Sequence, residues 1–524
     1  MAGTLHSRPM ETRAGLERTS SLRAGRLVLP ALLVLLLLLA HVYAVIVRAD
    51  REPHMDETEY LHASWMMASG ERLYETFFEH HSPFLFKIFE PLAPGEAEDV
   101  RPYVMHSRWL AGAFGLVSLL SLTALTWRVS SAAAPIAIAL LLATGPMWLR
   151  GFADIRAEVF ALAFFCAGTA LALLTPRWYG GIGVGLVAVS CLWTPKWPIA
   201  CVVVGIFWLA LCRERGRGVA AALTTLAAAF AALRLIVSFD AWWFFNVEVN
   251  AVLTRLVGTS QQALDTYFEG GVPFLFVPDA FAPWIVVPAA AVALAAFVID
   301  RRPIRLLPVM LLIAAFLEMR VLYPWPAIWA HYYLMWSVAA AAVIAVVPSS
   351  IAVLLTRVGA RSAFAVTITR LVTGTIIFLA VAHVIAVAPE RGDATTYWVS
   401  EPWLRERLEP GDVVWIEPTR HPIAVRDAHY YWFSVGQMAD GAAVLRQSER
   451  GRRFLPPPED FPPCTTPANL RFTLDPRRAG LSEAGACFER LLTSGRLRKT
   501  TIFDVYEIRL LESEANPVAL KGTE

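Results

Sequence analysis

Acidic, imidazole and aromatic side chains are concentrated in one short part of the chain, residues 55–86. Asp56 and Glu57 lie near the start of this segment, and the adjacent His80 and His81 lie near its end. Carboxylates and imidazoles are the groups that most often transfer protons in enzymes. Together with the aromatic rings they suit a sugar-binding active site, so this segment is the first candidate for chemistry.

Asp56 precedes a stretch in which Tyr60, Leu61 and Trp65 fall near helical spacing. This spacing predicts an amphipathic helix on the membrane surface, with Asp56 near its start. An Asp at a helix start commonly caps the helix, which is the simpler explanation. The neighbouring Glu57 and the later histidine pair favour a chemical role.

Two adjacent histidines beside carboxylates are compatible with a divalent cation. The sequence has no His-Glu-x-x-His motif and no two histidines at i and i+4. A divalent cation is therefore not favoured as a cofactor, and no metal ligand is assigned.

The elements that must position these residues are membrane spans. Of the 524 residues, 56% are hydrophobic and only 17% are charged, which is too apolar for a soluble protein. Residues 27–47 form a first apolar run, and ten more predict about eleven spans. These runs begin near Trp109, Ala132, Ala157, Gly180, Ile199, Gly218, Phe281, Leu306, His331 and Leu371.

Arginines in alternate connections orient the spans, because cytoplasmic loops are enriched in Lys and Arg. Residues 1–26 are then a cytoplasmic tail and residues 27–388 a membrane domain, with outer loops at 48–108 and 239–280. The arginines are Arg128; Arg177; Arg213, Arg215 and Arg217; Arg301, Arg302 and Arg305; and Arg357, Arg361 and Arg370. We predict an integral protein of a bacterial inner (plasma) membrane.

Residues 389–524 shift to mixed polar composition and are predicted to form a small extracytoplasmic α/β domain, periplasmic or extracellular. Asp412–Ile416 and Thr501–Leu510 have the pattern of strands. Cys464 and Cys487 lie in this region, where an oxidising compartment would allow a disulfide and two free thiols are the alternative. No predicted site residue lies in it.

The first outer loop resembles that of GT-C glycosyltransferases. The resemblance is carried by Asp-Glu-x-x-Tyr at Asp56 to Tyr60, by a later Gly and Tyr, and by His-x-Pro at His81 to Pro83. The closest branch includes protein O-mannosyltransferases and the aminoarabinose transferase of lipid A. Since the acidic pair of this loop supplies the family's catalytic carboxylate, the resemblance implies that Asp56, beside Glu57, is the general base.

A second acidic group, Asp154 and Glu158 around Arg156, opens a predicted span. The family often has an Asp at the start of this span, and here Glu158 takes that place. A helix that starts early would put Asp154 and Glu158 on one face, with Arg156 pointing elsewhere. The alternative is that the group only marks the polar end of a span.

A donor phosphate needs cations, and Lys87, Lys196 and Arg320 are predicted on the outer side. The alternative is that the lysines only extend their ammonium groups to the membrane–water interface. By resemblance, His331 and Tyr332 approach the lipid phosphate, although tyrosines also anchor spans. The predicted substrate-binding residues are Lys87, Lys196, Arg320, His331, Tyr332, Tyr60 and His81.

The expected function is glycosyl transfer from a polyprenyl-phosphate sugar. Nucleotide sugars are cytoplasmic, whereas the candidate loops face outward and the inner loops are too short for a nucleotide-binding domain. An inverting transfer needs one base, Asp56, and cations for the leaving phosphate. The acceptor, a glycan, lipid or protein, stays open. The charge of +2 gives no sign of nucleic acid, and a transporter or flippase for a lipid or sugar is the alternative.

Overall fold

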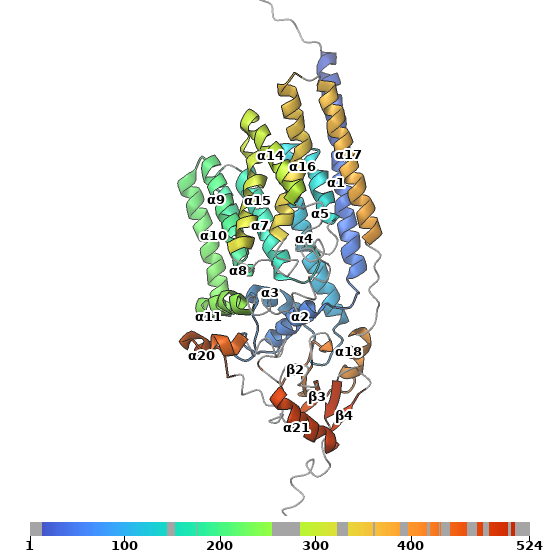
Figure 1. Cartoon of the computed structure of the whole chain (residues 1–524), viewed down its shortest axis with the longest axis vertical. Coiled ribbons are helices and arrows are strands. Elements are labelled where there is room, and N and C mark those ends of the chain that lie inside the picture. Colours follow the sequence, from blue (N-terminus) through green and yellow to red (C-terminus); the bar gives the residue numbers. More distant parts are fainter. Residues whose placement is uncertain are drawn as a thin grey trace, which may run out of the picture.

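The protein is a bundle of helices with a layer of short helices and a small sheet at one end (Figure 1). The computed structural model describes residues 13–143, 152–175, 177–253, 283–321, 334–359, 362–387, 397–416, 420–428, 430, 441–457, 469–474, 482–500 and 505–508. The start of α1 and the C-terminal sheet lie at opposite ends of the long axis.

Within the described residues, five helices are long and apolar enough to cross a membrane, which fits an integral membrane protein. They are α1 (Arg13–Arg48), α4 (Arg101–Val129), α7 (Ala157–Leu174), α10 (Arg215–Ile236) and α16 (Leu334–Arg357). Six more complete the bundle: α5 (Ala133–Leu142), α8 (Gly180–Trp193), α9 (Pro198–Leu211), α14 (Pro283–Asp300), α15 (Pro303–Val321) and α17 (Ser362–Val387). Each predicted apolar run overlaps one of these helices, and the number of crossings stays a prediction.

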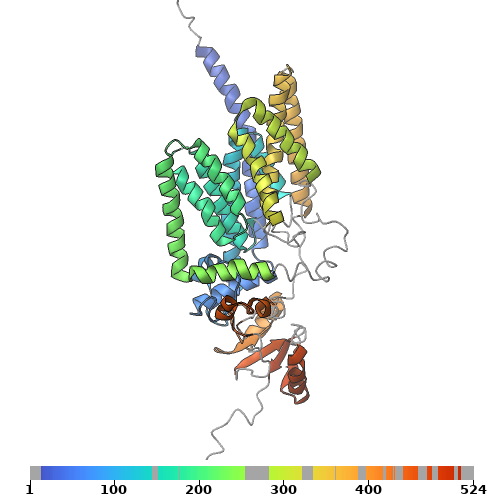
Figure 2. The same cartoon turned by 60° about the vertical axis from the view of Figure 1, so that its left-hand side comes forward.

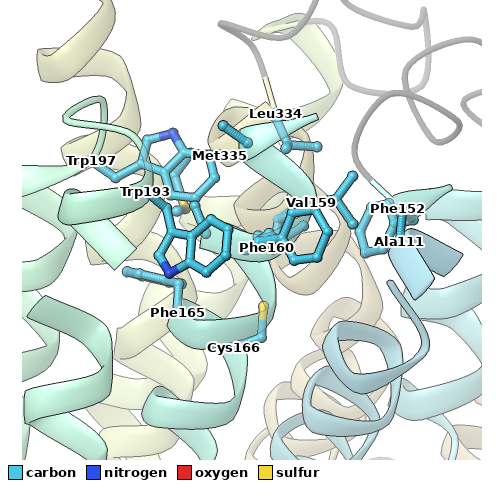
Figure 3. Packing of buried hydrophobic residues seen from close by; sticks show 14 of the residues in the cluster. Ala111, Phe152, Val159, Phe160, Phe165, Cys166, Trp193, Trp197, Leu334 and Met335 are labelled. Atoms are coloured by element: carbon cyan, nitrogen blue, oxygen red, sulfur yellow. The ribbon is translucent and has the colours of Figure 1, made fainter. Parts of the chain in front are cut away.

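Glycines let the helices nearest the site pack with backbones in contact. A Cβ added at Gly115 of α4 would lie 1.8 Å from the carbonyl oxygen of Phe152. The segment before α7 therefore lies directly on α4. The rings of Phe160 and Trp193 stack with centroids 5.0 Å apart, which fixes α7 against α8 (Figure 3).

The short helices α2 (Met55–Ala68), α3 (Pro83–Phe89) and η1 (Glu90–Leu92) form a layer beneath the bundle. In α2 every residue from Glu57 to Met66 is buried. The Tyr103 hydroxyl of α4 donates to the Leu61 carbonyl, and His62 contacts Ile423 from the C-terminal segment. The expected surface helix exists, but both flanks are covered, so the expectation of an amphipathic helix was wrong.

A second set of short helices, α11 (Phe239–Trp243) and η2 (Phe244–Val249), crosses the lower ends of the bundle (Figure 2). Arg450 of α20 (Glu449–Phe454) donates to the carboxylates of both Asp240 and Glu248. The predicted outer loop 239–280 is described only as far as residue 253.

The C-terminal segment carries a five-stranded sheet in the order β2-β1-β3-β5-β4. Its strands are β1 (Val413–Trp415), β2 (Arg426–Asp427), β3 (Leu470–Leu474), β4 (Leu497–Lys499) and β5 (Val505–Ile508), with helices α18 (Tyr397–Arg405) and α21 (Ser482–Thr493) beside them. β1 pairs parallel with β2 and β3, whereas β5 pairs antiparallel with β3 and β4. The two predicted strands correspond to β1 and β5.

The sheet segment is attached to the first outer loop. Backbone N–H groups of Phe78 and Ala97 donate to the carbonyls of Tyr430 and Ala424, at 2.6 and 3.0 Å. Cys464 and the side chain of Cys487 lie outside the described residues, so their pairing stays a prediction.

Candidate active site

Asp56 lies in the first turn of α2 without capping that helix. The N-cap is His54, whose ring accepts from the backbone N–H of Asp56, while the Glu57 carboxylate accepts from the backbone N–H of His54 at 3.0 Å. This reciprocal arrangement is a capping box. Capping therefore does not explain Asp56, and its carboxylate is available for another role.

The Asp56 carboxylate accepts a hydrogen bond from Nη1 of Arg156. Its side chain is 21% exposed, against 4% for both Glu57 and Glu158. Burial acts to raise the pKa of Asp56, but the positive charge of Arg156, with a contribution from His54, outweighs burial and holds the pKa below its ordinary value. Asp56 is thus an ionised carboxylate that a substrate can reach.

Arg156 links this acid to the next one. It is the N-cap of α7 in extended conformation, and its Nε lies 3.6 Å from Oε2 of Glu158. The expectation that Arg156 points away was wrong, because the helix begins only at Ala157. For the same reason Asp154 is not on the helix and does not share a face with Glu158.

Lys196, in the turn between α8 and α9, donates from Nζ to Oε1 of Glu158. Its side chain is 18% exposed. Contacts therefore join Asp56 to Arg156, Arg156 to Glu158 and Glu158 to Lys196, with charges that alternate in sign, and we call these four residues the ionic row. The row contains two predicted catalytic acids, Asp56 and Glu158, and the predicted phosphate-binding residue Lys196. Arg156, which was not a predicted site residue, connects the two acids.

Glu57 is occupied by a different partner, Arg108 of α4. The guanidinium donates to both carboxylate oxygens, at 3.1 and 2.5 Å, and the backbone N–H of Ile155 donates to Oε1 at 3.2 Å. Arg108 also donates to four backbone carbonyls between α1 and α2, those of Arg48, Ala49, Arg51 and Glu52. This geometry favours a positioning role for Glu57.

Asp154 lies beside the Glu57–Arg108 pair. Burial raises its pKa, and the negative charge of Glu57 acts in the same direction. Asp154 is therefore less suited to act as an ionised base than Asp56.

A cluster of imidazoles and carboxylates lies close to Asp56 and consists of Glu59, Glu79, His80 and His81. Glu79 Oε1 accepts from the backbone N–H of His80 at 2.7 Å and lies 2.8 Å from Nδ1 of His81. Burial raises the pKa of Glu59 well above its ordinary value, reinforced by Glu79, whereas burial and His81 lower the pKa of His80 to about 4. Sequence reasoning passed over Glu59 and Glu79, although an acid directly before a histidine pair was a usable signal.

The predicted substrate-binding residues Tyr60 and His81 do meet. The Tyr60 hydroxyl lies 3.3 Å from Nε2 of His81, and the two rings are edge to face. Both belong to the layer under the ionic row, so their placement supports a shared site.

Lys87 is not brought into the row. Its side chain is 52% exposed and its ammonium pairs with Glu90 at 2.7 Å. Leu85, Phe86 and Phe89 are buried on the opposite side of the short helix α3, which leaves Lys87 on the open side. Arg320 lies at the end of α15 with its side chain outside the described residues, as are His331 and Tyr332, so these three stay predictions.

Two groups of side chains in the described part of the chain have the geometry to hold a cation. The first is Glu59, Glu79, His80 and His81, and the second is His62, His421 and Asp427. In each, the potential ligand atoms lie within 4.8 Å of one another.

Comparison with known proteins gives a structural match without a sequence match. No family model and no curated protein matches the chain. The structure is similar to the crystal structure of ArnT from Cupriavidus metallidurans bound to undecaprenyl phosphate, with a TM-score of 0.55 and 16% identity, over 92% of this chain and 99% of that one. The chain therefore shares the fold of ArnT. The predicted GT-C-like fold is confirmed to this extent, and the ArnT-like branch stays a prediction.

Proposed function

We propose that this protein transfers a sugar from a polyprenyl-phosphate donor to an acceptor on the outer side of the membrane. The observation that carries the proposal is the ionic row, in which a reachable, ionised Asp56 pairs with Arg156, and Glu158 links Arg156 to a second cation, Lys196. The similarity to a protein bound to undecaprenyl phosphate supports a lipid-linked donor.

In the proposed reaction Asp56 acts as general base. Its carboxylate takes the proton of the acceptor hydroxyl while that oxygen attacks the anomeric carbon, and the bond from that carbon to the phosphate oxygen breaks with inversion. The electron pair leaves with the polyprenyl phosphate, whose added charge Arg156 and Lys196 stabilise. Phosphate is a good leaving group, so the second carboxylate that glycosidases use as acid is not needed.

Arg156 has two tasks in this scheme. Before the donor binds, its guanidinium holds the Asp56 carboxylate. A donor phosphate that binds Arg156 weakens this contact and makes Asp56 a stronger base when the reacting groups are in place. The same residue thus couples donor binding to proton removal.

The positive-inside rule supports an outward-facing site. Arg128 ends α4, and Arg301 and Arg302 join α14 to α15, which puts these arginines at the end of the bundle away from α2. We therefore propose that the N-terminus is cytoplasmic and that the site and the C-terminal segment face the periplasm or the exterior.

The test is a lipid extract from cells that lack the gene. A transferase predicts that a polyprenyl-phosphate sugar accumulates and disappears on complementation with the wild type or Asp50→Asn, but not with Asp56→Asn. Asp50 is a matched control, because it is 52% exposed and pairs with Arg101 at the surface. Unchanged lipid-linked sugars in the deletion strain, or full complementation by Asp56→Asn, would argue against the proposal.

A further inference from the structure

A second cluster of ligating side chains joins α2 to the C-terminal segment. It consists of His62 in α2, His421, and Asp427 at the end of β2, and we call these three residues the His62 cluster. The two histidine side chains are 0% exposed and that of Asp427 is 1% exposed. No step of the proposed reaction uses them, so the burial of three polar side chains needs its own explanation.

The partners of the two ring nitrogens of His62 indicate what lies between His62 and Asp427. Nδ1 lies 2.5 Å from the carbonyl oxygen of Ile423, and a carbonyl oxygen only accepts, so Nδ1 carries a hydrogen. In a neutral imidazole Nε2 then has a lone pair and no hydrogen. This Nε2 faces Oδ2 of Asp427, which is also an acceptor. Two facing acceptors need a positive charge between them, either a proton or a metal ion.

Asp427 is centred between two imidazoles. Its Oδ2 faces Nε2 of His62, and its Oδ1 lies 3.2 Å from Nε2 of His421. One ion between them would meet four ligand atoms, two imidazole nitrogens and both carboxylate oxygens. Two histidines and one carboxylate are a common ligand set for Zn²⁺.

The backbone around the cluster holds the rings in place. Ile423 has φ of 46°, a left-handed conformation that is unusual for a β-branched residue. Such strain persists where the surrounding structure imposes it, often at functional sites. Here it accompanies a carbonyl directed at His62, and histidines bound to metal commonly donate their other N–H to such an oxygen.

His421 is held in a similar way through its own backbone. The buried hydroxyl of Tyr397, at the start of α18, donates to the His421 carbonyl at 2.9 Å. The ring of His62 and the backbone of His421 are thus each held by a contact outside the cluster.

We propose that His62, His421 and Asp427 bind one divalent cation of the Zn²⁺ class, which fastens the C-terminal segment to α2. The site is structural, because its ligands are buried and none of them belongs to the ionic row. The cation would hold in place the helix whose first turn carries Asp56. The proposal does not depend on the reaction that the protein catalyses.

The first test is metal content, measured by mass spectrometry on the full chain purified in lipid nanodiscs from zinc-supplemented cells. We expect about one Zn²⁺ per chain in the wild type at this buried site. Asp427→Asn and His421→Ala should each lose most of that zinc, whereas the exposed control His106→Ala and the His80→Ala variant should retain it. A wild type without zinc, or the same zinc content in Asp427→Asn, would overturn the proposal.

A second test avoids variants that fail to fold. Wild-type protein is treated with a chelator and then supplied with Zn²⁺, Co²⁺ or Mg²⁺. Zn²⁺ should raise the thermal unfolding midpoint and Mg²⁺ should not, and Co²⁺ should give the absorption bands of a tetrahedral site with nitrogen and oxygen ligands. Equal stability with and without Zn²⁺, and no Co²⁺ bands, would instead assign a protonated His62 paired with Asp427 and reject the metal.

Discussion

Asp56 and Glu57 are neighbours in the chain with opposite environments. Asp56 belongs to the ionic row, where its side chain is 21% exposed and its carboxylate contacts the guanidinium of Arg156. Glu57 faces Arg108 and two backbone N–H groups, which occupy both of its oxygens. Both carboxylates have a lowered pKa, because in each case an arginine outweighs burial.

Charge alone therefore does not identify the base. Successive residues of an α-helix point about 100° apart, so the start of α2 aims one carboxylate at the site and the other at α4. The two carboxylates differ in whether an oxygen is still available to accept a proton. Asp56 has such an oxygen, whereas Glu57 and its partner Arg108 hold together α1, α2, α4 and the segment before α7.

The largest effect on activity is expected from Asp56→Asn. Without the carboxylate no group takes the acceptor proton, so the rate of sugar transfer should fall by about 100-fold or more. The protein should still insert and show an unchanged thermal unfolding midpoint. Transfer within a few-fold of the wild type would place the base elsewhere.

Glu57→Gln should act on stability instead. It leaves the buried guanidinium of Arg108 without its carboxylate, a loss of about 3–5 kcal/mol in the free energy of unfolding. The exposed pair of Glu75 and Arg72 supplies the control, since Glu75→Gln should leave the unfolding midpoint unchanged. If folded Glu57→Gln lost as much activity as Asp56→Asn, the division of roles would be wrong.

A smaller effect distinguishes the two predicted phosphate-binding lysines. Lys196→Ala removes a cation of the ionic row and should raise KM for the lipid-linked donor by about 10- to 100-fold. Lys87→Ala should leave KM unchanged, because Lys87 is exposed and pairs with Glu90. Equal effects of the two substitutions would contradict the placement of the donor phosphate at the row.

The pH profile gives the finest distinction. In Arg156→Gln the burial of Asp56 is no longer opposed by the guanidinium, so the pKa of Asp56 should rise. Asp56 must be ionised to act as base, and the acid limb of kcat/KM should therefore move to higher pH. Arg101→Gln, at the exposed pair with Asp50, should not move it, and a shift to lower pH in Arg156→Gln would reject Asp56 as the titrating group.

The sequence alone was sufficient to predict the helices of the bundle and about half of the site residues. Apolar runs located the helices, and the density of acids and histidines after the first span indicated α2 and its surroundings. Lys196 and Glu158 were each recognised as charges at the end of a span, and the structure shows that they pair. Their pairing depends on how α7 meets the turn between α8 and α9, which no local pattern contains.

Other features of the site were not predicted from the sequence, for two physical reasons. The direction of the Arg156 side chain was wrong because the expected helix had to include Asp154, whereas α7 begins only at Ala157 and leaves Arg156 as an extended N-cap. Arg108, His421 and Asp427 were missed because they contact α2 across long separations in sequence. A single sequence offers only local spacing, whereas these contacts come from tertiary packing.

In the proposed reaction an ionised carboxylate, Asp56, removes the acceptor proton, and the sugar leaves a lipid-linked donor with inversion. The most direct measurement places the purified protein in vesicles that contain a polyprenyl-phosphate sugar and no nucleotide, with an envelope extract as acceptor, and follows the anomeric configuration of the product by NMR. We expect free polyprenyl phosphate and a product of inverted configuration. A product of retained configuration, or one formed only when a nucleotide sugar is added, would contradict it.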